Sequence, residues 1–562
     1  MRLNATPVTV LALFLTGPVW ADEVNIELSV AGTYESGVYN EGAAEIVAYD
    51  ADSQLVLVVN ANATSIDLID ISDPTAPTLD STVDLSSYGG GINSVAVYDG
   101  IAVAAVEADV KQDDGSVVFF ELDGTILSQV TAGALPDMVT YTPDGQWVLV
   151  ANEGEPSDDF TNDPEGSVTI IDVSGGAASL TDSDACHAGF DSFALADLDS
   201  STRVFSPGSS VSQDFEPEYI AVKKNSKKAW VTLQENNAIA EIKIEKCKIK
   251  KVWGLGFKDY NATTNMLDAS NKDGAINITN WPALGMYQPD TIAAYNTDDE
   301  TYLITANEGD SRDYDGFSEE VRVADLVLDP TAFPDAATLQ EEANLGRLKT
   351  TTTLGDTDGD GDHDEIYSYG ARSFSIWDTD GNQVFDSGDD IAHITSMAYP
   401  DDFNSTDDEN DSFDSRSDDK GAEPEGVAVG KIEGRWFAFI GLERMGGIMV
   451  YDVTDPNDVE FIQYINNRDY SGNAEDLTAG DVSPEGVAFI SKSDSPTSSP
   501  LLVVGHEVSG TTTIFEIDVE VIDDDDSDDD DSSDDDDSSD DDDSSDDDDS
   551  SDDDDSDDDD CD

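Results

Sequence analysis

The 562-residue sequence has little positive charge and very little histidine. It contains 26 lysines and arginines against 125 aspartates and glutamates, a formal net charge of −99, and four histidines. A chain this acidic repels nucleic acid and anionic lipid and attracts divalent cations. The same composition suits a salty medium, where ions screen the repulsion among the carboxylates. The scarcity of histidine leaves little material for a histidine-based catalytic metal site.

Long apolar segments are also missing after the N-terminus. The chain begins with Met1 and Arg2, continues with an apolar stretch over residues 8–15, and has small residues just before Asp22. This pattern predicts a secretory signal peptide, residues 1–21, cleaved after Ala21. The alternative, an uncleaved membrane anchor, requires a longer apolar run. We therefore expect export to the periplasm, cell surface or exterior, with no transmembrane segment after the signal peptide.

Cysteine is rare, with only Cys186, Cys247 and Cys561 in the chain. In an oxidising compartment Cys186 and Cys247 can pair with each other, which leaves Cys561 to bridge to another molecule. Free thiols without partners are an equally good interpretation. Neither alternative resembles a zinc site.

Helical periodicity is nearly absent, and short apolar runs separated by Gly, Pro, Asn and Asp dominate the chain. One pattern, an acidic or polar residue after a turn followed by short strands, occurs seven times, at positions 45, 94, 137, 218, 290, 425 and 485. The shortest spacings, 43 and 49 residues, match one four-stranded propeller blade. The sequence thus predicts an all-β, seven-bladed β-propeller, with a strand at residues 26–31 completing the last blade. A β-sandwich or two smaller propellers are the alternatives.

The predicted domain organisation has three parts. The signal peptide is followed by the propeller, residues 22–522, with insertions at about 174–212 and 309–420. Residues 523–562 form a Ser/Asp-rich tail with 29 aspartates. Because this tail has almost no apolar side chains and repels itself, we expect it to be disordered.

Two acidic loops resemble calcium-binding loops. The first has carboxylates at alternate positions and a glycine at the sixth: Asp356, Asp358, Asp360, Asp362 and Asp364. Ca²⁺ takes six to eight oxygen ligands, which such a loop can supply. Tyr367 stands where an EF-hand has its bidentate glutamate, so a non-helical calcium loop is the better description. The second, weaker loop contains Asp378, Asp380, Asn382 and Asp389. The alternative for both is an acidic, solvated turn.

A second set of candidate ligands comes from the repeat itself, because most of the repeats start on a carboxylate and five of the strand runs that follow end on one. Equivalent positions of each blade converge on a propeller axis, so these groups can form a central metal site at one mouth of the channel. The candidates are Glu153, Glu218, Glu308, Glu425, Glu443, Glu485 and Glu507, together with Asp137, Glu235 and Asp290. The alternative is that each acid caps a turn within its own blade.

Arginines near these motifs are candidates for binding a phosphate or carboxylate. Arg312, Arg372 and Arg444 lie close to strand-end carboxylates, and with Glu308 they are the candidate catalytic residues. The alternative is structural pairing with neighbouring acids. A nucleophile elbow, a Walker loop and a Rossmann glycine pattern are all missing from the sequence.

Five segments of the chain resemble the bacterial choice-of-anchor I proteins. They are residues 151–155, 216–222, 230–238, 370–378 and 424–452. The resemblance covers roughly residues 30–520 and implies a secreted seven-bladed propeller, similar to mesenchyme-specific cell-surface glycoproteins and more distantly to propeller phytases. Some members carry an alkaline phosphatase label. The family varies in its C-terminal anchoring signal, and this chain departs there by having an acidic tail with Cys561.

These observations favour an exported or surface-associated, calcium-binding β-propeller that acts as a binding or scaffold module. Its expected partners are divalent cations and a surface or extracellular ligand of unknown identity, and not nucleic acid. The alternative is a metal-dependent phosphoesterase with its site at the channel mouth. A third hypothesis makes the aspartate tail a mineral or cation binder independent of the propeller.

Overall fold

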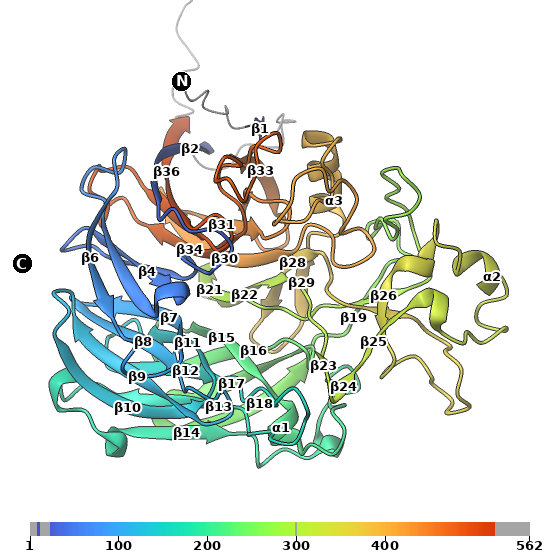
Figure 1. Cartoon of the computed structure of the whole chain (residues 1–562), viewed down its shortest axis with the longest axis horizontal. Coiled ribbons are helices and arrows are strands. Elements are labelled where there is room, and N and C mark those ends of the chain that lie inside the picture. The colour runs from blue at the N-terminus through green and yellow to red at the C-terminus, as the bar shows by residue number, and fades with distance from the viewer. Residues whose placement is uncertain (1–7, 12–22, 298–299, 523–562) are drawn as a thin grey trace, which may run out of the picture.

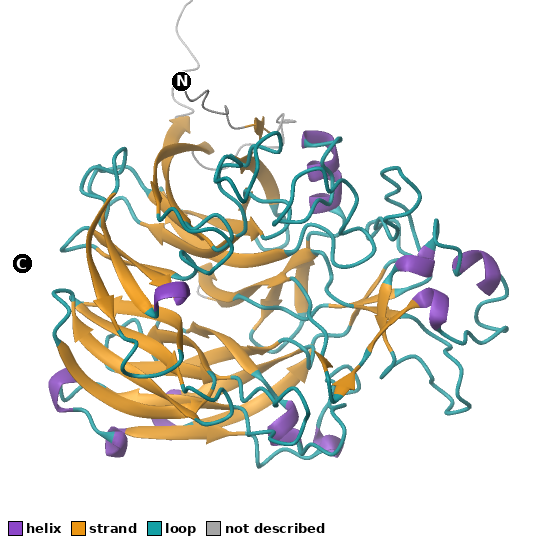
Figure 2. Cartoon of the chain, in the orientation of Figure 1, coloured by secondary structure: helices purple, strands orange, loops and turns teal. Residues whose placement is uncertain are grey.

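The computed structural model describes residues 8–11, 23–297 and 300–522. Seven antiparallel sheets surround a central axis, as Figures 1 and 2 show. The first three sheets follow chain order: β3 (Val47–Asp50), β4 (Leu55–Asn60), β5 (Ser65–Asp70) and β6 (Thr78–Asp84); β7 (Gly91–Tyr98), β8 (Ile101–Glu107), β9 (Asp114–Glu121) and β10 (Ile126–Ala134); β11 (Pro136–Tyr141), β12 (Trp147–Asn152), β13 (Ser167–Asp172) and β14 (Ala185–Gly189).

The remaining four sheets repeat this plan with longer connections. They are β15 (Pro217–Val222), β16 (Lys228–Leu233), β17 (Ala238–Lys243) and β18 (Lys248–Gly254); β21 (Ile292–Thr297), β22 (Glu300–Asn307), β28 (Ser373–Asp378) and β29 (Gln383–Asp386); β30 (Pro424–Ile432), β31 (Arg435–Leu442), β32 (Ile448–Asp452) and β33 (Glu460–Asn466); β34 (Pro484–Ile490), β35 (Leu501–His506), β36 (Thr511–Ile522) and β2 (Glu23–Glu35). A short strand, β1 (Val8–Leu11), pairs with the edge of β33.

The first strand of every sheet lines the axis, and these strands form a closed ring. β3 contacts β7, each first strand contacts the next along the chain, and β34 contacts β3 again. The ring is also closed through hydrogen bonds, because β2 pairs with β36 from Glu23 to Glu35. The predicted completion of the last sheet by the N-terminal strand is therefore confirmed, as is the seven-bladed propeller.

The core lies between neighbouring sheets, and the strand sequences explain it. Alternate residues of a strand face opposite sides of its sheet. In β8, Val103 and Ala105 pack against β12 of the following sheet, whereas Ala102 and Ala104 pack against β4 of the preceding one. Both faces of such a sheet are thus buried. Its strands are therefore continuous apolar runs, and polar and apolar residues do not alternate along them.

The long segments between strands contain further structure. The predicted insertion at 174–212 holds β14, and that at 309–420 holds β28 and β29. Residues 257–286 and 309–368 build an appended lobe with its own core, which includes Tyr260, Trp281 and Leu345. The short strands here are β19 (Phe257–Asp259), β20 (Leu284–Met286), β23 (Asp313–Tyr314), β24 (Phe317–Ser318), β25 (Glu320–Arg322), β26 (Lys349–Thr351) and β27 (Tyr367–Ser368).

Helices are few and short in the described residues. The α-helices are α1 (Val211–Asp214), α2 (Ala336–Leu339) and α3 (Asp390–Ala398), and the 3₁₀ turns are η1 (Ala61–Ala63), η2 (Ala177–Ser179), η3 (Asp182–Asp184), η4 (Leu195–Asp197), η5 (Ile244–Lys246), η6 (Val323–Asp325) and η7 (Leu345–Arg347). Over the described part of the chain, none of these helices has the length and apolar content needed to span a bilayer.

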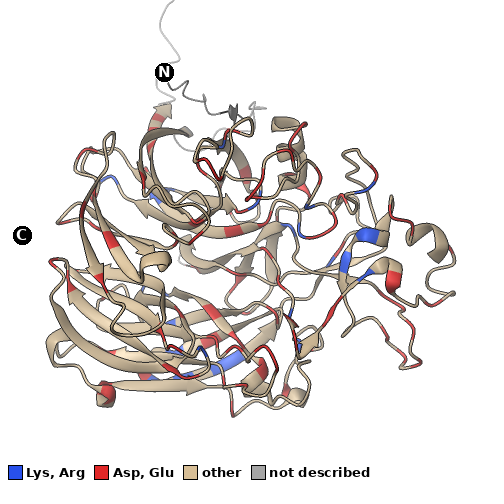
Figure 3. Cartoon of the chain, viewed as in Figure 1, with Lys and Arg blue, Asp and Glu red and all other residues tan. Residues whose placement is uncertain are grey.

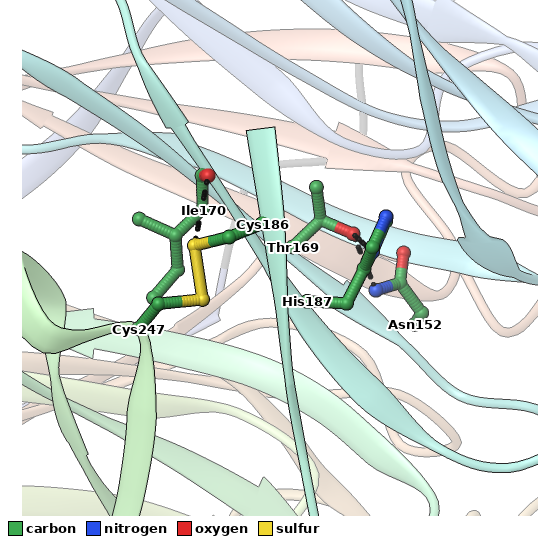
Figure 4. Close-up of a disulfide and its surroundings, with 6 residues drawn as sticks. All are labelled: Asn152, Thr169, Ile170, Cys186, His187 and Cys247. Atoms are coloured by element: carbon green, nitrogen blue, oxygen red, sulfur yellow. Dashed lines mark hydrogen bonds between the residues drawn. A yellow bond between two sulfur atoms is a disulfide. The ribbon is translucent and has the colours of Figure 1, made fainter. Parts of the chain in front are cut away.

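A disulfide joins the third and fourth sheets (Figure 4). Cys186 on β14 is bonded to Cys247, which follows η5, with 6.4 Å between their Cα atoms. Of the two alternatives left open by the sequence, the structure therefore has the paired form. Cys561, the signal peptide's cleavage site and the aspartate tail lie outside the described residues.

Candidate metal centre at the propeller axis

Four of the seven inner strands begin with the same local distortion. In β11, β15, β30 and β34 the pairing register shifts directly after the first residue, which is a proline in each strand. The acidic residue after the proline therefore lies in a β-bulge, and bulges redirect the side chain that they carry. Because the strands are antiparallel, the carboxylate that ends the second strand lies at the same mouth of the channel. The Pro-acid motif is thus the start of a bulged strand.

Neighbouring inner strands approach closely where these acids sit. A Cβ atom added to Gly426 would lie 2.2 Å from the carbonyl oxygen of Glu485, and one added to Gly486 would lie 2.5 Å from that of Glu45. Only glycine permits this distance. The glycine of the Pro-Glu-Gly motif therefore brings successive inner strands, and their carboxylates, together at the axis.

Six of the seven sheets contribute one carboxylate to an inner ring. The ring consists of Glu45, Asp137, Glu218, Asp290, Glu425 and Glu485. The second sheet has Asn93 instead, whose amide donates a hydrogen bond to the carbonyl oxygen of Pro136 at 3.1 Å. Carboxylate oxygens of Asp290, Glu308 and Glu425 lie within 4.8 Å of one another, close enough to share one ion.

Several of these carboxylates have a buried oxygen without any partner. The Oε2 atoms of Glu218, Glu235, Glu425 and Glu485 are inaccessible to solvent and accept no hydrogen bond. Glu218 and Glu235 are 7% and 6% exposed. A buried, unpaired polar atom is costly, and a buried, unpaired charge much more so. These oxygens are therefore available to a ligand that can accept them as donors.

The ring carboxyls, and Glu235 at the end of the second strand of the fourth sheet, share a strong preference for the neutral form. Burial raises the pKa of Glu45 to about 8, and the pKa values of Asp137 and Glu235 to about 7. Burial, followed by mutual repulsion, raises the pKa of Glu218, Asp290, Glu425 and Glu485 well above the usual value.

The repulsion reaches across the axis. Glu485 of the seventh sheet is repelled by Asp137 of the third and Asp290 of the fifth. These sheets are not neighbours, so the carboxylates face one common space. A cation in that space would replace the protons and satisfy the unpartnered oxygens.

The second-strand acids lie around this ring. Burial and then repulsion from nearby acids raise the pKa of Glu153, Glu443 and Glu507 above the usual value. Glu308 is more fully engaged, because Gln234 donates to its Oε2 at 2.9 Å and Lys420 lies 2.5 Å from its Oε1. The structure therefore brings all seven predicted channel ligands to one mouth of the propeller.

A neighbouring acidic group is already neutralised by the protein. Glu308, Glu423 and Glu443 also have oxygens within 4.8 Å of one another. Although burial raises the pKa of Glu423, the charges of Lys420, Arg416 and Arg444 hold it well below its usual value. Lys420 is the last residue of the second insertion, and Glu423 precedes the proline of the sixth repeat as Glu216 precedes that of the fourth. Neither Glu423 nor Lys420 was identified from the sequence.

The three candidate phosphate-binding arginines are bonded to protein groups. Arg312 is 1% exposed, and its guanidinium lies 2.8 Å from Asp214 and 3.0 Å from Glu216. Arg444 contacts Asp407 together with Glu423 and Glu443.

Arg372 instead donates to three backbone carbonyls, those of Asp268, Ser417 and Asp419. All three guanidiniums therefore hold loops in place.

The first predicted calcium loop divides into two exposed or half-exposed groups. Asp356, Asp358 and Asp360 have oxygens within 4.8 Å of one another, whereas Asp362 and Asp364 gather with Asp329. Asp329 lies in the preceding segment and was not identified from the sequence. Asp356 also accepts hydrogen bonds from three amides of its own loop, so part of its capacity is used by the turn.

The second predicted loop behaves as a turn. Asp378 accepts hydrogen bonds from the backbone amides of Asp380 and Asn382 and from the Asn382 side chain. Asp389 accepts one from the backbone amide of Met266 at 3.0 Å and lies 3.7 Å from His393. The carboxylates that would hold an ion here are therefore used within the protein.

Comparisons with known proteins agree with this architecture. Gigasin-3a of Magallana gigas is 34% identical over 194 residues, which are 32% of this chain and 66% of that protein. The mesenchyme-specific cell surface glycoprotein of Strongylocentrotus purpuratus is 25% identical over 285 residues, 44% of this chain and 36% of that protein. The chain thus spans less than two thirds of the length of these relatives.

The solved structures with a similar fold are more distant in sequence. A chain of Kuenenia stuttgartiensis hydrazine synthase has a TM-score of 0.44 at 11% identity and covers 86% of this chain and 99% of its own. The WD40 domain of Toxoplasma gondii coronin has a TM-score of 0.43 at 8% identity, covering 89% of this chain and 87% of its own. The model of the choice-of-anchor I domain matches residues 45–456, from the first ring carboxylate to the sixth sheet. The chain therefore belongs to the choice-of-anchor I domain family.

Proposed function

We propose that this protein is an exported, surface-associated binding module whose propeller holds a calcium ion at its axis. The observation that supports the proposal is the set of four buried, unpartnered carboxylate oxygens, on Glu218, Glu235, Glu425 and Glu485. They come from three sheets, the fourth, sixth and seventh, so no single local turn explains them. A cation there removes the repulsion and links the blades.

Calcium suits this donor set better than other common ions. The donors are all carboxylates, which are hard ligands, and neither histidine nor cysteine belongs to the ring. Ca²⁺ accepts six to eight oxygens in flexible geometry, whereas Mg²⁺ needs a strict octahedron and keeps several waters. Because the ring carboxyls have raised pKa values, binding of the ion would displace protons, and affinity would rise with pH.

The surface-associated part of the proposal has independent support. One relative is named as a cell surface glycoprotein, and the Cys186–Cys247 disulfide suits an oxidising, extracytoplasmic environment. The phosphoesterase alternative has less support, because the arginines that it requires are bonded to protein acceptors. A calcium site that stabilises a binding module, by contrast, requires no arginine that is free to bind phosphate.

Calorimetric titration of the full chain with CaCl₂, after treatment with EDTA and dialysis, tests the proposal. We expect a stoichiometric phase that is separate from the weak uptake by the aspartate tail, and a melting temperature that chelation lowers by several degrees. The variant Glu218→Gln/Glu485→Gln should lose that phase. The control Glu121→Gln/Glu245→Gln removes two exposed carboxylates and should keep it.

A third variant, Asp356→Asn/Asp358→Asn, assigns any remaining phase to the exposed loop. Two results would refute the axial site: wild-type protein without a stoichiometric phase, or a ring variant that binds calcium as the wild type does.

A further inference from the structure

Lysines are concentrated on one blade of this acidic protein. Residues 223–251 contain nine of the chain's 26 basic residues and three glutamates, a formal net charge of +6. Figure 3 shows basic segments on the fourth sheet and others on the appended lobe, while acidic segments are spread over the whole chain. We call the following residues the lysine surface: Lys223, Lys224, Lys227, Lys228, Lys243, Lys246, Lys248, Lys250 and Lys251.

Strand pairing aligns part of the lysine surface into a row. Lys228 is directly opposite Lys243, and Lys243 is directly opposite Lys248. Opposed residues of an antiparallel pair project on the same side about 5 Å apart, where like charges are destabilising. Glu241 pairs with Lys228 and Lys250. Among the described residues, no acidic group forms an ion pair with Lys243, Lys246 or Lys248, which are all exposed. A row that repels itself needs an anion from elsewhere.

The turn that carries this row is fixed in place. Cys247 lies between Lys246 and Lys248, has a left-handed backbone with φ of 46°, and is tied by the disulfide to Cys186 on the neighbouring sheet (Figure 4). An anion that binds here therefore does not have to order the turn first.

The lysine surface and the end of β36 lie on the same face of the propeller. Pro217 pairs with Leu233 in the fourth sheet, and Pro484 pairs with His506 in the seventh. These pairs lie at the end of the strands where the inner ring is. Lys228 begins β16, so the lysine row is at the opposite end. β36 begins beside His506 and runs away from the ring to Ile522. Ile522, the last described residue, thus lies on the face that bears the lysines.

We propose that the aspartate tail, residues 523–562, docks on the lysine surface of its own chain. The tail contains 29 aspartates, arranged in blocks of four separated by serines. It is the densest negative charge in the sequence, and the lysine surface is the densest positive one. At physiological ionic strength the Debye length is about 8 Å, so the acidic body does not prevent an attraction that acts at contact distance.

The tail is long enough to reach the fourth sheet from the seventh. Its 40 residues span up to roughly 130 Å when extended. A globular body of this size is about 60 Å across. The distal aspartate blocks therefore reach the lysines even along a curved path. Tethering also gives the tail an effective concentration near the millimolar range, which favours docking within one chain over docking between dilute chains.

A fluorophore on Cys561 tests this proposal in the full chain. The other two cysteines are joined in the disulfide, so labelling is specific. We expect high anisotropy of the dye at 20 mM NaCl, a fall to the value of a free tail by 1 M NaCl, and no dependence on protein concentration. The variant Lys243→Glu/Lys246→Glu/Lys248→Glu should weaken docking about tenfold or more, because each lost pair contributes a factor of up to about five.

The matched control is Lys272→Glu/Lys431→Glu/Lys492→Glu, which changes the net charge equally at three exposed lysines outside the surface. It should follow the wild-type salt curve, and near-ultraviolet circular dichroism checks that both variants fold. Equal behaviour of the two triple variants would overturn the proposal. An anisotropy that rises with protein concentration, together with oligomers in light scattering, would overturn docking within one chain.

Discussion

Raising the pH without calcium should destabilise this protein in a range where ordinary carboxylates no longer titrate. The six ring carboxyls and Glu235 have folded-state pKa values above those of the unfolded chain. Such groups contribute stability that is complete below the unfolded pKa, near 4, and is lost as the pH rises through the folded pKa. For Glu235 the range ends near pH 7, and for Glu45 near pH 8.

The size of the loss follows from the shift. Each pKa unit corresponds to about 1.4 kcal/mol, so Glu235, moved from 4.5 to about 7, accounts for about 3 kcal/mol over that whole interval and for about 1.4 kcal/mol of it above pH 6. The entropy of unfolding of a chain this long is about 1 kcal/mol per kelvin, so one such group shifts the melting temperature by about 3 °C. The ring groups interact, so their contributions do not add simply.

Calcium should reverse this trend. The ion binds the ionised carboxylates, so its affinity rises with pH, and at one hundred times its dissociation constant it adds about 2.7 kcal/mol. We therefore expect melting temperatures in EDTA to fall between pH 6 and 8.5, and the shift produced by calcium to grow over the same interval. Differential scanning calorimetry in both buffers measures it.

Variants separate the ring from the rest of the acidic surface. Asp137→Asn/Glu235→Gln should flatten the profile in EDTA, whereas Glu121→Gln/Glu245→Gln should leave it unchanged. The reasoning fails if the melting temperature in EDTA stays level or rises from pH 6 to 8.5.

Three further perturbations examine how the site is held. Replacing both cysteines of the disulfide by serine should lower the free energy of unfolding by about 2–4 kcal/mol in guanidinium titrations, and a reductant should bring the wild type to the same value. Gly426→Ala should cost about 1–3 kcal/mol in the same assay, because the new methyl group overlaps a neighbouring backbone, whereas Gly175→Ala, with open space around it, should be nearly neutral. Arg312→Met should cost about 3–5 kcal/mol at pH 7.5, since it leaves two buried carboxylates unpaired, and part of that loss should be recovered at pH 5, where thermal melts can detect it.

The repeat made most of the fold predictable. Each blade is formed by strands that are close in sequence, so the alternation of apolar runs and turns predicts nearly all of the strand pairing. The strand over residues 26–31 was assigned to the last sheet because that sheet lacked a fourth strand, and its pairing with β36 confirms the assignment. The appended lobe could not be predicted, because its core joins residues 257–286 to 309–368, and β21 and β22 lie between these two segments in the sequence.

The candidate site was predictable only where it repeats. Glu425 and Glu485 follow a proline in the same position of their blades, so their convergence follows from the symmetry. Lys420 belongs to an insertion that does not repeat, and only the folded chain shows that it pairs with Glu423 beside the ring. The Cys186–Cys247 pair was undecided for the same reason, since a separation of 61 residues gives no information on proximity until β14 is placed beside η5.

One exception within the ring indicates that its carboxylates are not needed to build the blades. The second sheet has Asn93 at the equivalent position, and the asparagine amide is satisfied by a neighbouring backbone carbonyl. A neutral side chain at this position is therefore compatible with the bulge, the strand and the closure of the ring. The other six sheets nevertheless carry an acid there, and three of those acids, Glu218, Glu425 and Glu485, bury an oxygen that contacts no donor. Since the fold accepts asparagine, these carboxylates are not needed to build the blades, and the cation that we propose at the axis would be a partner suited to their shared charge.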